Sequence, residues 1–477
     1  MAKNSRLICP AEMNGRADQM REFDAIVIGI GTAGSYLVGR LAKAGKRVAA
    51  IERNLFGGTC INFGCTPTKA LVASAYAAHL ARRASNYGVI IDSPVRVDMK
   101  RIQARKTEIV APREREIEEW ITSLDNCTVY RGQAKFVASR QIQIADEILT
   151  ADQIFLSVGG RASVPPIAGL ADVHYHDNAS ILELDTLPEH LLIIGGSYIG
   201  LEFAQMFRRF GSAVSVIEMG PRLIQREDKD ISDAVYAILE KEEVNIYLSS
   251  TCISANRSGS SIEVQLHGPD RGPLRLTGSH LLVATGRRPN TDDLGLEHTG
   301  IKLDTHGFIA VDDYLRTSEE GVFALGDCNG RSAFTHMAYN DFEIVAGNLL
   351  DGDQRSLKDR IQAYALYIDP PLGRAGATEL DLRKAGRPTL VGKLAMSGVA
   401  RAVEKGETEG FMKIYVDRES KLIAGAAILG SSGDEAIHCI LDIMYARVPY
   451  TVITRAAHIH PTVSELIPTM LSNLAPL

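Results

Sequence analysis

Two apolar runs in the chain each lead through a glycine-rich stretch into an amphipathic segment and then into a second apolar run. Starting at Phe23, a strand and a glycine turn are predicted by FDAIVIGIGTAG, a helix by SYLVGRLAKAG and a second strand by RVAAIE. The same order returns at Leu191, in LLIIGGSYIGLEFAQMFRRFGSAVSVIE. Each stretch therefore predicts a β-α-β unit.

The glycines of the first unit have the spacing of a dinucleotide-binding turn. Gly29, Gly31 and Gly34 fit the pattern G-x-G-x-x-G, in which glycine allows a tight turn, close backbone approach to a pyrophosphate, and close packing of helix on strand. The following helix N-terminus points at the phosphates. Glu52 ends the second strand about 20 residues on, where a carboxylate accepts hydrogen bonds from an adenosine ribose. We expect a dinucleotide here.

The second unit repeats this pattern with one departure. Gly195 and Gly200 hold the outer glycine positions, and Ser197 stands in place of the middle glycine. A side chain at that position narrows the space for a pyrophosphate. A second nucleotide is still predicted.

The residue that ends the second strand of this unit bears on which nucleotide binds. It is Glu218, and a carboxylate suits a free 2′-hydroxyl but repels a 2′-phosphate. NADH is therefore favoured over NADPH. Arg222 and Arg226 lie nearby, and they either meet a phosphate or sit solvated on the surface.

The rest of the chain continues with β-rich stretches and a final section of a different kind. Pro370 and Pro371 open this section, which reads as strands followed by helices without a glycine fingerprint. That pattern argues for an α+β domain with a role in assembly.

Composition narrows the class of protein. The 477 residues include 52 Lys and Arg against 58 Asp and Glu, a net charge of -6 without long single-sign blocks, so neither nucleic acid nor a membrane surface is expected as a principal partner. The first 20 residues lack a secretory apolar core, and no apolar stretch reaches the length of a membrane span. We expect a cytoplasmic protein whose residues 1–20 form a flexible tail.

Two of the seven cysteines stand close together, in GGTCINFGCTPTKAL. The spacing of Cys60 and Cys65 places both sulfurs near one helix start, and a helix N-terminus lowers the pKa of a thiol and favours the reactive thiolate. No second cysteine pair or suitably spaced histidine follows, so no metal site is expected. A redox-active dithiol is predicted, with two buried core cysteines as the alternative. The remaining cysteines are widely separated and expected to be inert: Cys9, Cys127, Cys252, Cys328 and Cys439.

Six motifs occur in a familiar order: GIGTAG with Glu52, GGTCINFGCTPTK, GGSYIGLEFA, VATGRRPN, ALGDC and HIHPTVSE. The chain resembles the class I flavoprotein disulfide reductases from about residue 22 to its end. The resemblance implies an α/β fold with two Rossmann-like dinucleotide-binding domains and a C-terminal α+β dimerisation domain, in a homodimer. The expected limits are 21–158 with 286–355 for the FAD-binding domain, 159–285 for the NAD(P)-binding domain, and 360–477 for the dimerisation domain.

The resemblance also implies the path of the electrons. FAD occupies the first nucleotide site and a nicotinamide nucleotide the second, and electrons pass through the flavin into a Cys60–Cys65 disulfide. By position in the motif, Cys65 lies next to the flavin and Cys60 exchanges with substrate. Lys69, four residues beyond Cys65, is implied to stabilise the reduced flavin, with Glu202 as its partner.

Further cofactor contacts follow from the motifs. Tyr198 resembles the aromatic residue that covers the flavin until the nicotinamide displaces it, and Asp327 the acid that binds the ribityl chain. Thr59 and Gly286 are assigned to cofactor binding through GGTC and VATGRRPN. His336 resembles a position near the flavin, with a structural histidine as the alternative. Val158 stands in for a more usual threonine, which loosens any prediction of polar contacts there.

The last motif bears on the electron acceptor. Disulfide exchange needs a group that takes and returns a thiol proton, and an imidazole does so at neutral pH. His460 and Glu465 match the acid–base dyad of the family, whereas His458 is expected to be structural. Because family members supply this histidine from the other subunit, the resemblance predicts an incomplete site in a monomer.

Four functions remain open. The favoured one couples NADH or NAD to a small-molecule or protein-bound dithiol or disulfide, as in dihydrolipoyl dehydrogenase. The second is a mercuric reductase-like enzyme that reduces metal ions or electrophiles, although the chain ends in SNLAPL without a cysteine pair. Glutathione reductase is third, because Glu218 and Ile224 stand where its NADPH-binding arginines are expected. The fourth is a non-catalytic component of a larger complex. The physiological substrate and the direction of the reaction do not follow from the motifs.

Overall fold

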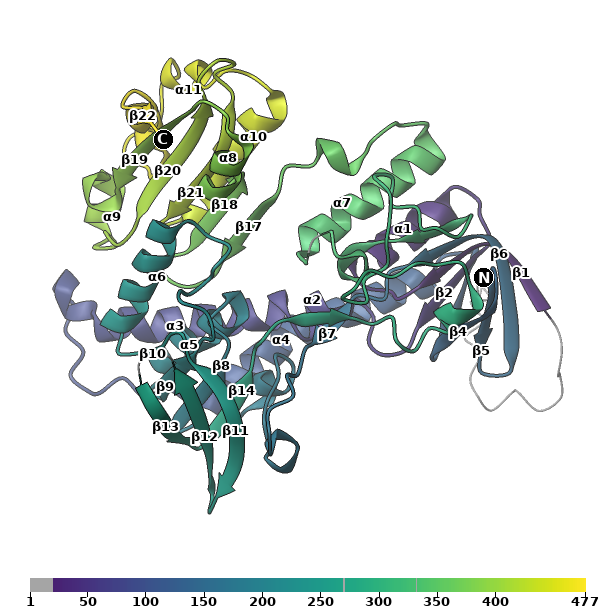
Figure 1. The fold of residues 1–477 in the computed structure, drawn as a ribbon, viewed down its shortest axis with the longest axis horizontal. Helices are drawn as coiled ribbons and strands as arrows, with labels where there is room; N and C mark the ends of the chain where they lie inside the picture. The colour runs from purple at the N-terminus through teal and green to yellow at the C-terminus, as the bar shows by residue number, and fades with distance from the viewer. Residues whose placement is uncertain (1–19, 269–270, 332) are drawn as a thin grey trace. The chain divides into compact units, whose positions relative to one another are not determined.

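Residues 20–268, 271–331 and 333–477 are described by the structure, a computed structural model (Figure 1). The expected N-terminal tail, apart from Met20, lies outside the described residues, and so does Cys9. Contacts divide the chain into two compact units: the first is Met1–Ala70, Gln103–Ser163 and Gly286–Arg360, and the second is Leu71–Ile102, Val164–Thr285 and Ile361–Leu477. Helices α3 (Cys65–Arg82) and α4 (Met99–Thr122) each contain a point of division.

The first unit is built on a mixed sheet in the order β3-β2-β1-β6-β5-β4, with β16 beside β6. Strands β1, β2, β3, β6 and β16 run parallel, whereas β4 and β5 pair antiparallel. A separate ribbon pairs β7 with β15. The bounds are β1 (Met20–Ile28), β2 (Val48–Glu52), β3 (Cys127–Arg131), β4 (Ala134–Ala138), β5 (Gln141–Ile144), β6 (Glu147–Leu156), β7 (Gly160–Ala162), β15 (Arg287–Pro289), β16 (Val322–Ala324), α1 (Thr32–Lys43), α2 (Gly58–Asn62) and α7 (Thr335–Ala346).

The last four residues of strand β1, 25–28, are buried on both faces of this sheet. Their successive side chains point in opposite directions, so Ala25 and Val27 join the core that also contains residues of α1 and α7, while Ile26 and Ile28 join the core on the other face. Helices α1 and α7 lie against each other (Figure 1). Burial on both faces explains why this part of the strand, AIVI, is entirely apolar.

The second unit begins with a parallel sheet in the order β10-β9-β8-β14, followed by an antiparallel sheet in the order β11-β12-β13. Its helices α5 and α6 follow β8 and β9 along the chain. The bounds are β8 (His190–Ile194), α5 (Tyr198–Phe210), β9 (Ala213–Ile217), α6 (Lys229–Lys241), β10 (Asn245–Tyr247), β11 (Thr251–Ser258), β12 (Ser261–Gly268), β13 (Arg271–Gly278) and β14 (His280–Val283).

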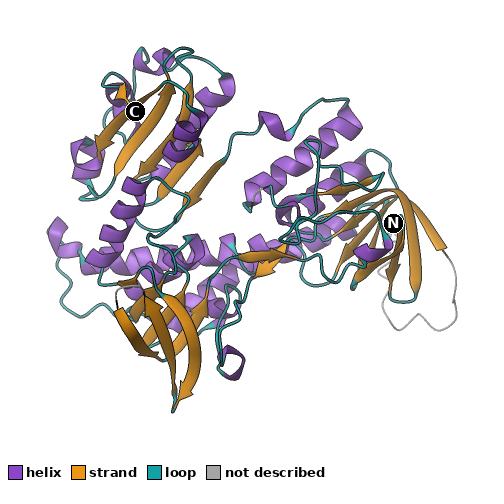
Figure 2. Ribbon diagram, in the orientation of Figure 1, coloured by secondary structure: helices purple, strands orange, loops and turns teal. Residues whose placement is uncertain are grey.

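The C-terminal part of the second unit is an antiparallel sheet in the order β17-β18-β21-β20-β19-β22, with α10 packed on β18 and β21 (Figure 2). One core joins this sheet to α5, since Phe203 and Phe207 cluster with Leu372 and Leu429. The bounds are β17 (Ala363–Leu366), β18 (Leu372–Gly376), α8 (Glu379–Ala385), β19 (Thr389–Ala395), α9 (Ala400–Glu404), β20 (Phe411–Asp417), β21 (Ile423–Leu429), α10 (Gly433–Ala446), α11 (Thr451–Thr454), α12 (Ile467–Leu471) and β22 (Ala475–Pro476).

The predicted fold class is confirmed. Each glycine fingerprint joins a parallel strand to a helix, and the C-terminal section combines an antiparallel sheet with helices. The expected domain limits stay predictions. Among the residues that the structure describes, no helix has the length and apolar character needed to cross a membrane.

Candidate active site

The glycines of the first turn meet three different surroundings. Gly29 has a φ of +92°, and a Cβ there would overlap the carbonyl of Ser157. A Cβ at Gly34 would overlap the carbonyl of Gly29, where helix meets strand. Gly31 has a φ of -79° and only the Cα of Gly58 near, at 3.8 Å. The protein's own packing therefore requires glycine at two positions, whereas the space beside Gly31 suits an incoming group.

The start of α1 is suited to an anion. Gly31 is its N-cap residue, no side chain caps the helix, and no acidic residue lies in its first turn. Nearby, a cavity of about 280 Å³ is bordered by Gly29, Gly31, Glu52 and Thr59. These groups fit the ADP half of a dinucleotide, since glycine walls admit the pyrophosphate and the carboxylate reaches a ribose.

Glu52 is buried and also fastens the turn. Its Oε2 accepts a hydrogen bond from the backbone N–H of Ile30 at 2.7 Å, and its Oε1 accepts one from Asn54 at 2.8 Å. Each carboxylate oxygen can accept a second bond, so a ribose can still be held. The sequence assigned Glu52 to the ribose alone and missed this structural role.

The second turn has the same backbone geometry as the first. Gly195 has a φ of +117°, and a Cβ there would overlap the carbonyl of Ala284. A Cβ at Gly200 would overlap the carbonyl of Gly195. Ser197 is the N-cap of α5, with a φ of -106° that any residue adopts. Its presence therefore leaves the course of the turn unchanged.

Glu218 fastens the second turn much as Glu52 fastens the first. Its Oε2 accepts the N–H of Gly196 at 2.7 Å, and its Oε1 accepts the N–H of Gly220 at 2.6 Å and the Nε2–H of Gln225 at 3.1 Å. Both fingerprints thus end in a carboxylate that holds its own glycine turn. Arg222 is half-buried and Arg226 exposed.

The two cysteines lie in two successive helices. Cys60 is in the short helix α2, and Cys65 is the first residue of α3. Neither cysteine is part of a disulfide, and Cys65 Sγ lies 3.2 Å from the hydroxyl of Thr335. A hydrogen bond with Cys65, together with burial, raises the pKa of Cys60. The expected lowering is therefore wrong for Cys60, because these two effects outweigh the helix.

Lys69 and Glu202, which are predicted to pair, lie in α3 and α5. Lys69 lies one turn after Cys65 in α3 and so on the same helix face. Glu202 is buried in α5, and its Oε1 accepts the N–H of Tyr367 at 3.0 Å. The pairing of Lys69 with Glu202 stays a prediction.

Asp327 follows β16, and its carboxylate is partly buried. Its Oδ2 is 3.5 Å from Nε of Arg287, and burial raises the pKa of Asp327 despite that guanidinium. Gly286, just before Arg287, has a φ of +121°, which glycine adopts readily. Asp327 and Gly286 keep their predicted roles as proposals.

Two residues of the first nucleotide cavity were missed by the sequence argument. Arg161 donates a 2.8 Å hydrogen bond to Oδ1 of Asn290, whose Nδ2 donates to the carbonyl of Val158 at 2.9 Å. All three border the cavity. The polar contact at Val158 thus comes from its backbone, and the only available signal was the asparagine of VATGRRPN.

Tyr198 is held by a pair of residues that no motif marked. Its hydroxyl donates to Oε1 of Glu227 at 2.9 Å, and Tyr364 donates to the same oxygen at 2.7 Å. Burial raises the pKa of Tyr198.

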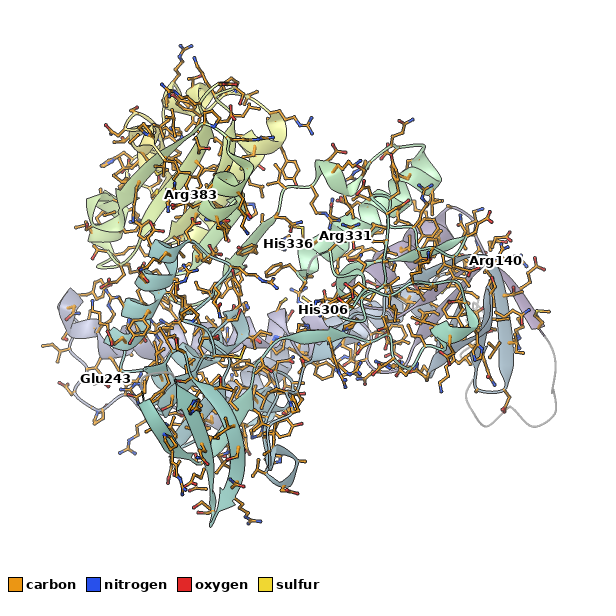
Figure 3. All side chains as sticks on the ribbon, viewed as in Figure 1. Arg140, Glu243, His306, Arg331, His336 and Arg383 are labelled. Carbon is orange, nitrogen blue, oxygen red and sulfur yellow. The ribbon has the colours of Figure 1, made fainter. Side chains whose placement is uncertain are left out.

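His336 stacks on Phe334 in the first unit, with 5.8 Å between ring centroids (Figure 3).

The predicted acid–base dyad is formed within the C-terminal section. Nδ1 of His460 lies 2.8 Å from Oε2 of Glu465, and the imidazole is 74% exposed while the carboxylate is 10% exposed. The contact orients the ring and leaves Nε2 for the proton exchange that the prediction assigns to this histidine. His458, His460 and Glu465 border one open pocket of about 410 Å³. No cluster of three or more metal-binding side chains occurs within the described ranges.

Models of known families match most of the chain. One described as pyridine nucleotide-disulphide oxidoreductase matches residues 23–341, and one described as the dimerisation domain of the pyridine nucleotide-disulphide oxidoreductases matches residues 362–471. The first match contains both glycine turns and the cysteine pair, and the second contains the histidine dyad.

Curated relatives and solved structures agree with these matches. The probable pyridine nucleotide-disulfide oxidoreductase RclA of Escherichia coli is 34% identical over 95% of this chain and 99% of its own length. A mercuric reductase of Streptomyces lividans is 32% identical, over 93% and 94%. A dihydrolipoyl dehydrogenase of Haloferax volcanii is 28% identical, over 93% and 94%. The Cu(II) complex of HOCl-induced flavoprotein disulfide reductase RclA from Escherichia coli superposes with a TM-score of 0.85 and 34% identity, over 94% of this chain and 99% of that chain.

Proposed function

Because the chain belongs to the pyridine nucleotide-disulphide oxidoreductase family, whose members bind FAD and NAD(P)H, we propose that it transfers electrons from a nicotinamide nucleotide to a disulfide substrate through Cys60 and Cys65. The observation that carries the proposal is the 2.8 Å contact between His460 and Glu465. A proton-exchanging imidazole is required for thiol–disulfide exchange and not for simple electron transfer.

The cofactor sites follow from the two glycine turns. The first turn, with Glu52 and Thr59, holds FAD, which when bound accepts hydride from the nicotinamide and delivers two electrons to the cysteine pair. The second turn holds the nicotinamide nucleotide, and Tyr198 covers the flavin until that nucleotide enters. Glu218 favours NADH, since its carboxylate repels a 2′-phosphate.

The cysteines and the histidine carry out the exchange with substrate. The thiolate of Cys60 attacks one substrate sulfur, the substrate S–S bond breaks, and the leaving thiolate takes a proton from His460. The thiolate of Cys65 then attacks the Cys60 sulfur of the mixed disulfide, which closes the Cys60–Cys65 disulfide and expels the second substrate sulfur as a thiolate. That thiolate takes a proton from solvent. The net reaction consumes NADH, one proton and a disulfide, and yields NAD and two thiols.

A homodimer is proposed as the working form. The matched dimerisation domain supports it, and so do apolar side chains exposed in the same section, namely Tyr445, Val452 and Ile459 at 50%, 49% and 79%. An exposed histidine dyad beside Ile459 suits coverage by a second subunit. His460 would then serve the cysteine pair of the partner subunit.

The substrate class has two candidates. A small-molecule or protein-bound disulfide, such as a lipoyl group, suits the histidine dyad. Reduction of a metal ion is the second candidate, supported by the Cu(II) complex of the Escherichia coli relative and by the mercuric reductases among the relatives. Thiolates bind soft metal ions readily, so Cys60 and Cys65 would be the receiving groups.

The deciding experiment measures NADH and NADPH oxidation by the purified flavoprotein with lipoamide, glutathione disulfide, Cu(II) and Hg(II) as separate acceptors. We expect bound flavin, a larger kcat/KM for NADH than for NADPH, and turnover with a disulfide that disappears in His460→Gln. If only metal ions support turnover and His460→Gln does not change that turnover, the substrate is a metal ion and not a disulfide. A protein without flavin would refute the proposal.

A further inference from the structure

Asp327, the acid proposed to bind the ribityl chain, lies in a short 3₁₀ turn, Gly326–Asn329, that follows β16. A Cβ added at Gly160 would lie 3.8 Å from the Cβ of Asp327, and Gly160 borders the first nucleotide cavity. Both residues belong to the first unit. The course of this turn therefore sets where the carboxylate of Asp327 stands beside the cavity.

A single oxygen of a buried carboxylate holds both ends of the turn. Oδ2 of Asp341, in α7, accepts the backbone N–H of Gly326 at 2.8 Å and an Nδ2–H of Asn329 at 2.9 Å. Nδ2 of Asn329 also donates to the carbonyl of Ala324 at 3.1 Å. The side chains of Asp341 and Asn329 lie in the interior, at 2% and 5% exposed. Asp327 stands between the two anchored residues.

The other oxygen of Asp341 is paired with Arg360. Nη2 of the guanidinium donates to Oδ1 of Asp341, and both side chains are buried. Nε of Arg360 donates to Oδ1 of Asn340 at 2.8 Å, which orients the guanidinium plane. A buried carboxylate without a counter-charge is strongly unfavourable. Arg360 therefore stabilises the carboxylate that holds the turn.

From these contacts we infer that Asp341 and Arg360 position Asp327 for the ribityl chain of FAD by fixing the turn Gly326–Asn329. The inference rests on the proposed function, in which Asp327 binds that chain. The two oxygens of Asp341 face the turn and Arg360, so its effect on the cofactor passes through Asp327. Asp341 and Arg360 are positioning residues and do not touch the reacting atoms.

Asp341→Asn should weaken the binding of FAD. An amide has one oxygen, so when that oxygen faces the turn, the NH₂ group faces the donors of Arg360. Either the turn or the arginine must then shift, and Asp327 loses its fixed position. We expect the Kd for FAD to rise roughly tenfold to a hundredfold, as for the loss of a buried hydrogen bond to a charged group. Dilution of the holoenzyme, followed by the rise in flavin fluorescence, measures this Kd.

The same substitution in Asp327→Ala shows whether Asp341 acts through Asp327. Once the carboxylate at position 327 is absent, its placement no longer matters, so adding Asp341→Asn should raise the Kd less than about twofold further. A residue that acted on the cofactor independently would multiply the two effects. A full tenfold rise in the Asp327→Ala background would therefore overturn the inference.

Another acid that pairs with an arginine at a turn of the same unit provides the control. Asp312 accepts the N–H of Tyr314 at 2.9 Å and the Nε–H of Arg316 at 2.7 Å. Asp312→Asn removes similar contacts from a different turn, so it should leave the Kd for FAD unchanged. A rise in Asp312→Asn as large as that in Asp341→Asn would show a general loss of stability and overturn the inference.

Asn329→Ala decides the question should Asp341→Asn not fold. It removes one anchor of the turn and leaves the ion pair of Asp341 with Arg360 intact, so the Kd should rise about threefold to tenfold. An unchanged Kd in Asp341→Asn, or in Asn329→Ala where only that variant folds, would overturn the positioning role. Absence of FAD from the unsubstituted protein would instead refute the proposed function.

Discussion

At the scale of the residue, the local surroundings of Cys60 decide its reactivity. Its hydrogen bond with Cys65 and its burial both raise its pKa, so the reduced thiol holds its proton more firmly than a solvated one. A protonated thiol is a poor nucleophile. Cys60 therefore needs a base, and the exposed imidazole of His460 is the group that we propose for it.

Substitution of Cys60 separates disulfide turnover from flavin reduction. In Cys60→Ser we expect NADH to reduce the flavin at a rate close to that of the unsubstituted protein, while turnover with disulfides falls at least about a thousandfold, because a hydroxyl does not form the mixed disulfide. Stopped-flow flavin absorbance and steady-state assays measure the two. Cys439→Ser, at an exposed cysteine outside the pair, is the control and should retain both activities. Disulfide turnover that survives in Cys60→Ser would show that this thiol is not the exchanging one.

The buried side chain of His176 makes the free energy of unfolding depend on pH. It is 5% exposed, its Nδ1 has no hydrogen bond among the described residues, and burial, with His174 and His280 beside it, lowers its pKa to about 4. The unfolded chain, with a histidine pKa near 6.5, binds the proton first as pH falls. The stabilisation is therefore complete above about pH 6.5 and is lost progressively down to pH 4, by up to about 3 kcal/mol in the free energy of unfolding.

Urea unfolding at pH 7.5 and pH 5 tests this assignment. His176→Gln should show a smaller loss of stability between the two pH values than the unsubstituted protein. His306→Gln, at an exposed histidine (Figure 3), should show the full loss. Equal losses in all three proteins would assign the pH dependence to other groups.

At the scale of the element, the two β-α-β units share the same local structure at the glycine turn. In each, the first glycine of the turn has a positive φ and the last lies where helix meets strand, and the acid that ends the second strand binds the turn's backbone. This local structure explains why serine is tolerated at position 197, since the middle position of the turn needs no special backbone angle. In the first turn, the open space beside the middle glycine suits the ligand, whereas glycine at the two outer positions is a requirement of the fold.

Two alanine substitutions in the first turn separate these requirements. Gly34→Ala forces a Cβ onto the carbonyl of Gly29 and should lower the free energy of unfolding of the apoprotein by at least about 2 kcal/mol. Gly31→Ala meets no such contact, so it should leave the apoprotein within about 0.5 kcal/mol and weaken FAD binding instead. Urea titration and flavin fluorescence measure the two quantities. The assignment fails if Gly31→Ala destabilises the apoprotein as much as Gly34→Ala.

At the scale of the whole molecule, the proposed chemistry is shared between segments at opposite ends of the chain. Cys60 and Cys65 belong to the first unit, and His460 with Glu465 belongs to the second, in the section that matches a dimerisation domain. The imidazole of His460 is exposed in a single chain. A dimer in which each histidine serves the partner's cysteines accounts for this exposure.

Subunit complementation tests that arrangement. Cys60→Ser and His460→Gln should each be inactive with disulfides, but coexpression of the two should restore about a quarter of the unsubstituted activity. Random pairing gives about half heterodimers, and each of these contains one intact site made from the histidine of one subunit and the cysteines of the other. Sedimentation measures the dimer, and differently tagged subunits isolate the heterodimer. If coexpression restores nothing while heterodimers form, each histidine serves its own chain.

The sequence by itself determined those parts of the site whose residues lie close together along the chain. The glycine turns, the acids that end their second strands, the cysteine pair and the histidine dyad each lie within a short segment, where strand and helix periods place the side chains. The same local patterns predicted the two β-α-β units, and the family resemblance that they support implied the rest of the fold class and the histidine dyad. These parts of the site were therefore predicted by residue number.

Only the tertiary structure decided which distant groups meet. Thr335 lies beside Cys65 across 270 residues, and Tyr364 reaches Glu227 across 137. No sequence period or motif marks either contact, because residues so far apart along the chain meet only where the packed fold brings them together. The raised pKa of Cys60 has the same origin: the helix effect is local and could be read from the sequence, whereas the burial and the hydrogen bond that oppose it exist only in the folded chain.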